Sequence, residues 1–104
     1  MIRQFDVCPN PSRRGTAERP YVVVVQSRFL DAFRNRACVP LIAKDFLKPI
    51  PRLNPVIRIG ERDLYFHPVE ITNIPLHLLR DPIGNLEPHR DKIIAALDLV
   101  FTGI

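Results

Sequence analysis

Proline is the feature that most restricts how this chain can fold. Of its 104 residues, 11 are proline, about twice the average usage in globular proteins. Proline lacks a backbone N–H and its ring clashes with the preceding helical turn, so it excludes long helices wherever it recurs. Because the prolines are spread over most of the sequence, we expect short extended elements there and a helix only near the C-terminus.

The composition is that of an ordinary globular domain. Apolar residues make up 46% and charged residues 25% of the chain, far from the low hydrophobicity of disordered proteins. We expect residues 1–104 to form a single domain. A domain of this length buries roughly two-thirds of its unfolded surface, so it is marginal alone and would gain stability from a second subunit.

The strongest strand pattern lies at residues 21–26. Val22–Val25 are four consecutive β-branched residues that follow Tyr21, which favours a strand buried on both faces at the centre of a sheet. A looser alternation predicts a first strand at residues 2–7. The turn-forming residues between positions 8 and 20 predict a loop.

A second apolar run, Ala37–Ala43, contains Pro40. Because proline cannot donate a ladder hydrogen bond, we expect this strand at a sheet edge, or Pro40 at a bulge. Residues 56–59 and 64–67, on either side of Gly60, predict an antiparallel hairpin. The other expected elements are an extended connector at 48–55, a short strand at 71–79 interrupted by Pro75, and a turn at 81–85.

The last segment favours a helix. Pro88 suits its first turn, and Gly103 suits the position just past its end. An apolar stripe recurs there at spacings of three and four: Ile93, Ile94, Leu97, Val100, Phe101 and Ile104. The end of this stripe can pack on the sheet or form a contact surface, and the pattern leaves both open. The predicted fold is mostly β, antiparallel, with one C-terminal α-helix.

No pattern of catalytic, metal-binding or cofactor-binding residues is present in the sequence. The three histidines lack metal-ligand spacing, and no phosphate-binding glycine loop or nucleophile signature occurs. His67 or Asp63 could form an acid–base pair with Glu70, but solvent-facing charges explain these residues more simply. We therefore expect no cofactor, no metal ion and no enzymatic activity.

The lack of a visible targeting signal predicts a soluble, cytoplasmic protein, and the charge pattern bears on its partners. The net charge is +4, and residues 1–36 carry seven basic and three acidic side chains. The longest basic run is Arg13-Arg14, without interleaved aromatics, so we expect a solvated basic face and no direct sequence-specific contact with nucleic acid.

No signal peptide or membrane-spanning run is visible. Cys8 and Cys38 are expected to be reduced and buried or otherwise inert.

A series of short segments then points to a family. In order they are Tyr21–Ser27, Leu30-Asp31, Arg36, Val39–Leu41, Pro55–Gly60, Asn73–Pro75 and the terminal run from Ile94 to Gly103-Ile104. Each piece alone is unspecific, but their order over nearly the whole chain resembles the CcdB family, the toxins of toxin–antitoxin modules.

The resemblance implies a fold and an activity. CcdB toxins have an SH3-like barrel of antiparallel strands with one C-terminal helix, and they form homodimers without catalytic activity. The dimer binds the A subunit of DNA gyrase and traps the complex in which the DNA is cut. A CcdA-type antitoxin neutralises the toxin by wrapping a flexible tail over it.

The resemblance also implies gyrase-binding residues. The end of the terminal helix corresponds to Thr102, Gly103 and Ile104, with Asp98 one turn earlier. Phe29 and Leu30 form an assisting apolar pair for which core packing is the alternative. The best-known members carry Trp in place of Thr102 and Asn in place of Asp98, so affinity or target preference can differ.

Two other functions compete with gyrase poisoning. A MazF-type RNA-cleaving toxin shares the fold, and the basic Arg13-Arg14 loop mildly favours it. The terminal Gly-Ile and the missing catalytic constellation count against it. The chain could also be a decayed, non-toxic homologue that still binds its antitoxin.

Overall fold

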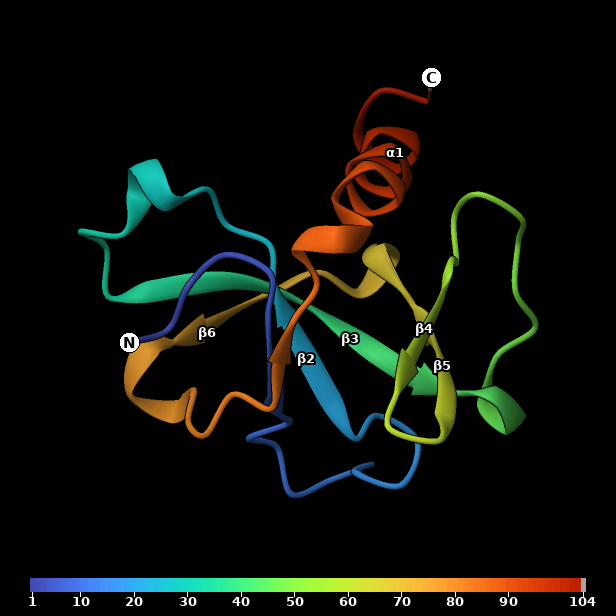
Figure 1. The fold of residues 1–104 in the computed structure, drawn as a ribbon, viewed down its shortest axis with the longest axis horizontal. Coiled ribbons are helices and arrows are strands. Elements are labelled where there is room, and N and C mark those ends of the chain that lie inside the picture. Colours follow the sequence, from blue (N-terminus) through green and yellow to red (C-terminus); the bar gives the residue numbers. More distant parts are fainter. Residues whose placement is uncertain (104) are drawn as a thin grey trace.

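The computed structural model describes residues 1–103, and Ile104, one of the expected site residues, lies outside the described part. Within it, seven strands form one antiparallel sheet that curls into a half-barrel, and a helix projects from one side (Figure 1). The strands are β1 (Asp6–Pro9), β2 (Tyr21–Val24), β3 (Asn35–Ala43), β4 (Val56–Ile59), β5 (Arg62–Phe66), β6 (Thr72–Pro75) and β7 (Gly84–Asn85).

The only α-helix within residues 1–103 is α1 (Arg90–Phe101). Short 3-10 helices connect the other elements: η1 (Arg28–Leu30), η2 (Lys44–Phe46), η3 (Pro68–Glu70), η4 (Leu76–Leu78) and η5 (Glu87–His89). The predicted fold class, mostly antiparallel β with one C-terminal helix, is therefore confirmed. None of the described helices is long and apolar enough to cross a membrane.

Strand β2 lies between β1 and β3, as its valine run predicts. Val23 and Val25 belong to the larger core cluster, which also holds Phe5 and Phe66. On the opposite face, Val22 and Val24 belong to a second cluster, which contains both cysteines. The strand is thus buried on both faces, and the two cores share one sheet as their common wall.

Pro40 lies inside the longest strand, so the expectation of an edge strand is wrong. One side of β3 pairs with β2, while the other pairs with β6 as far as Cys38 and with β5 from Leu41 onward. Pro40 occupies the gap between these two partners, where its carbonyl oxygen accepts a hydrogen bond from the backbone N–H of His67 at 3.1 Å. Its missing N–H therefore interrupts neither ladder.

The predicted hairpin is present as β4 and β5, joined by a tight turn in which Gly60 has a φ of +61°. The connector before it is non-helical from position 47 on, as expected, and the buried side chain of Asn54 holds it in place. The Asn54 amide accepts from the N–H of Ile50 at 2.9 Å and donates to the carbonyl of Phe66 at 3.1 Å. It also lies 3.0 Å from Nδ1 of His67.

Two local predictions need correction, one near the N-terminus and one at residues 84 and 85. The first strand begins at Asp6 and not at Ile2, because Phe5 adopts a φ of +70° and the N–H of Asp6 bonds to the carbonyl of Arg3 at 3.1 Å, closing a turn. Residues 84 and 85, expected within a turn, form β7 and pair with β1. This pairing brings the beginning of the chain next to the segment that leads into α1.

Helix α1 covers the larger core with one face only. Ile93 and Ala96 are fully buried in it, and Ile94 and Leu97 pack against it partly buried. Phe101, the last residue of the predicted stripe that the structure describes, is 67% exposed. The stripe therefore divides into a core half and an exposed end, and Pro88 lies in the 3-10 turn η5 just before the helix begins.

Candidate partner-binding surface

The end of α1 forms a polar and apolar tip that projects away from the sheet (Figure 1). The carbonyl of Asp98 accepts the N–H and the hydroxyl of Thr102, both at 2.8 Å, and the N–H of Gly103 at 3.1 Å. Gly103 has a φ of +74°, and an added Cβ would meet no atom within 4 Å. Glycine is therefore suited to this position by its backbone conformation, since space is not limiting.

The two described tip residues expected from the sequence, Thr102 and Gly103, are exposed, as are Asp98 one turn earlier and the preceding Phe101. Exposure of Phe101 favours a contact surface over core packing for this end of the stripe. The family resemblance did not place Phe101 in the binding site. Its position in the apolar stripe was compatible with either a contact surface or core packing. Ile104, expected to be the apolar anchor, lies outside the described residues.

Phe29 and Leu30 lie in the lobe, which we define as residues 27–35, the segment that follows β2 and ends at the first residue of β3. The Ser27 hydroxyl accepts from the N–H of Phe29 at 3.2 Å and caps η1. Phe29 is 93% exposed and Leu30 45% exposed, so the alternative of core packing is wrong for this pair. Phe33, which sequence reasoning did not place in the site, is also exposed on this lobe.

The lobe and the tip are separate surfaces of one chain. A groove of about 580 Å³ has Phe29 on one wall and Arg90 and Ile94, from the first half of α1, on the other. The tip residues do not line it. Arg28 and Arg34 flank Phe29 and Phe33 of the lobe, so basic and aromatic side chains are neighbours in the sequence here.

The carboxylates considered for acid–base chemistry pair with arginine side chains. Glu70 receives two hydrogen bonds of 2.7 Å from the guanidinium of Arg19, and these bonds lower its pKa. His67 Nε2 is 4.0 Å from Glu70 Oε2. Asp63 pairs with Arg58 at 3.1 Å. A carboxylate with a lowered pKa that faces a guanidinium is a weak proton acceptor.

The two cysteines are buried, as expected, and are not joined by a disulfide. Burial raises the pKa of Cys8 to about 11 and that of Cys38 to about 12. Both side chains therefore remain thiols at neutral pH, which disfavours a nucleophilic role. Among residues 1–103, no group of three or more His, Cys, Asp or Glu side chains could hold a metal ion.

The fold and these surfaces define a small β-rich domain whose exposed apolar groups suit protein partners. A family model described as CcdB protein matches residues 4–103, and the chain belongs to this family. Family membership supports a role as the toxin of a toxin–antitoxin system. A comparison with curated proteins found no significant match.

Proposed function

We propose that this protein poisons DNA gyrase by binding the gyrase A subunit and trapping the complex in which the DNA is cut. The observation that carries the proposal is the family match over residues 4–103. The exposed tip and the exposed pair Phe29 and Leu30 are consistent with it, because apolar side chains at such positions contact partners.

Poisoning of this kind requires binding and no chemistry by the toxin itself. A ligand that binds the cleaved complex more tightly than the resealed one shifts the equilibrium toward the cleaved state. A tenfold preference corresponds to about 1.4 kcal/mol, so a few well-placed anchors suffice. In the proposal the anchors are Thr102, Gly103 and Ile104, with Asp98, Phe29 and Leu30 assisting.

The proposed active form is a homodimer in the cytoplasm, neutralised by a CcdA-type antitoxin. The exposed end of the α1 stripe supports self-association, because Phe101 leaves apolar surface uncovered on one chain. Two copies would present two tips to a two-fold symmetric target.

The test combines purified protein with gyrase, ATP and supercoiled plasmid. Linear DNA after denaturation of the enzyme is the expected product, with RNA left intact in a parallel reaction. Addition of a cognate CcdA-type antitoxin should restore supercoiling. Intact plasmid at all toxin concentrations would refute gyrase poisoning and favour a non-toxic homologue.

A MazF-type RNA-cleaving toxin is the second candidate. Arg13 and Arg14 are exposed on the loop before β2, where they could contact an RNA backbone. In that case RNA cleavage would occur without gyrase and would be lost in Arg13→Ala and Arg14→Ala variants.

A further inference from the structure

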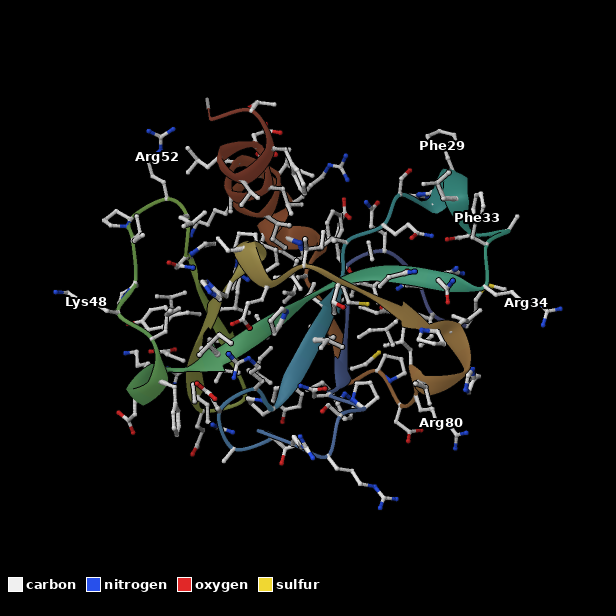
Figure 2. All side chains as sticks on the ribbon, turned by 180° about the vertical axis from the view of Figure 1, so that it is seen from behind. Phe29, Phe33, Arg34, Lys48, Arg52 and Arg80 are labelled. Atoms are coloured by element: carbon white, nitrogen blue, oxygen red, sulfur yellow. The ribbon has the colours of Figure 1, made fainter. Side chains whose placement is uncertain are left out.

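The lobe combines exposed apolar side chains with a backbone that is held from inside. Phe29 is 93% and Phe33 64% exposed, and both stand on the outer side of the lobe (Figure 2). Two successive turns shape the backbone: the N–H of Leu30 bonds to the carbonyl of Ser27 at 3.0 Å, and that of Phe33 to the carbonyl of Leu30 at 3.1 Å. A loop with this arrangement presents its apolar groups without collapsing around them.

Arg36, the second residue of β3, holds the lobe from the core side. Its side chain is only 4% exposed. The guanidinium donates to the carbonyls of Phe33 and Asn35 through Nη1, and to the carbonyl of Asp31 at 3.2 Å through Nη2. The Asp31 carboxylate is 3.8 Å away. One buried side chain thus fixes three carbonyl groups of the lobe.

Gln26, two residues after the end of β2, holds the same segment from the other side. Its Nε2 donates to the carbonyl of Leu30 at 3.2 Å and to that of Asn35 at 3.1 Å. Its Oε1 accepts from the N–H of Ala37 at 3.0 Å. Because Gln26 connects β2, the lobe and β3, both ends of the lobe are fixed to the sheet.

The stability of the core alone does not explain why an arginine is buried at position 36. Burial of a guanidinium carries a desolvation cost that an apolar side chain of similar size avoids. Within residues 1–103, the Nε of Arg36 is the one buried side-chain N or O atom without a hydrogen-bond partner. The hydrogen bonds that the Arg36 guanidinium donates all end on the lobe, so the benefit of the buried charge is the shape of that lobe.

We propose that Arg36 is a positioning residue, which holds the lobe in a preformed shape that presents Phe29 and Phe33 as one binding anchor. Phe33 thereby joins the partner-binding surface. A preformed loop loses little conformational entropy when it binds, so the anchor binds more tightly than the same side chains on a mobile loop. The inference depends on the proposed function only for the identity of the partner, the gyrase A subunit.

Trypsin provides a test that needs no partner, because Arg28 and Arg34 are exposed cleavage sites in the lobe. We expect Arg36→Gln to raise the rate of cleavage after these two residues about tenfold, since local opening governs proteolysis of folded proteins. Cleavage after Arg13 and Arg14, in the distant loop, should keep its wild-type rate and serves as the internal control. An unchanged rate in the lobe would overturn the inference.

Binding to the gyrase A subunit tests whether the positioning acts through the aromatic pair. Arg36→Gln should weaken binding about tenfold in the wild-type background and have no further effect when Phe29 and Phe33 are both alanine. That coupling distinguishes positioning from a general loss of stability, for which the effects would multiply. Arg62→Gln, the same change at an exposed position on β5, should bind as the wild type does.

The two proposals can fail separately. If the wild-type protein does not bind the gyrase A subunit, the proposed function is wrong, while the trypsin result still decides the role of Arg36. If the wild type binds and Arg36→Gln binds equally well, the positioning role is wrong and the proposed function stands. If Arg36→Gln fails to fold, Gln26→Ala takes its place. We expect Gln26→Ala to give the same faster lobe cleavage and weaker binding, with smaller changes in both. Cleavage and binding like those of the wild type would contradict the inference.

Discussion

Deletion of residues 102–104 separates the proposed binding role of the tip from its role in stability. The deletion removes the hydrogen bonds that the N–H and hydroxyl of Thr102 and the N–H of Gly103 donate to the carbonyl of Asp98, at an exposed helix end. No buried apolar group of residues 1–103 is lost, because the core contacts of α1 lie at Ile93 and Ala96. We expect unfolding to become easier by about 1 kcal/mol, the range of a peripheral change.

Binding to the gyrase A subunit should fall far more. Loss of a central anchor costs about 2 kcal/mol or more, which corresponds to a rise of roughly thirtyfold in Kd. A thermal melt measures the first quantity, and titration with the purified gyrase protein measures the second. Sedimentation should still show a dimer, and a cognate antitoxin should still bind.

The control is Ile50→Ala, which removes an apolar side chain of 58% exposure from the connector before β4, away from tip and lobe. Its binding to gyrase should match that of the wild type. A truncated protein that traps gyrase at the wild-type concentration would refute the assignment of the tip. The gyrase-binding surface would then lie on the lobe.

Four further outcomes follow from the structure. Asn54→Ala should lower the free energy of unfolding by about 2 kcal/mol, since buried backbone groups lose their partner; a urea titration measures it, and an unchanged midpoint would contradict the role. The pKa of Glu70 is lower in the folded protein than in the unfolded chain. Ionised Glu70 therefore stabilises the fold above the pKa of the unfolded carboxyl, and this stabilisation is lost as the pH falls through the pKa of the folded carboxyl. Because Glu70 is half-exposed, this loss of folding stability is at most about 1 kcal/mol. Thermal melts between pH 7 and pH 3 should show the loss in the wild type but not in Glu70→Gln. Cys38 should resist a thiol reagent at pH 8 until the protein unfolds, because burial raises its pKa to about 12; rapid labelling of the native protein would show that the second core opens. Sedimentation at micromolar concentration should show a dimer. A monomer would contradict the proposal that two tips are presented together to gyrase.

Local patterns predicted the elements whose causes are local. Four consecutive valines identify β2 because both faces of a central strand are apolar, and Gly60 identifies the β4–β5 turn because its backbone needs a positive φ. The tip residues and the lobe pair could be located because they follow recognisable segments. Their exposure, however, came only from the structure.

The errors arose where distant segments decide the outcome. Pro40 fits an interior strand because β3 changes partner beside it, and nothing near it in the sequence shows that change. Likewise, Arg36 looks like any strand arginine until the lobe folds back over it. The signal that could have found the lobe is Gln26-Ser27 directly after an apolar strand, with a side chain that can bond both backbone ends and a capping hydroxyl.

The pairing of β1 with β7 and the burial of Ile93 and Ala96 make the fold depend on contacts between early and late parts of the chain. The larger core is incomplete until α1 has left the ribosome, since Ile93 and Ala96 supply part of it. A nascent chain that still lacks α1 also lacks the tip. Under the proposed function, a chain therefore completes its larger core and gains its target-binding tip in the same step, when α1 packs on the sheet.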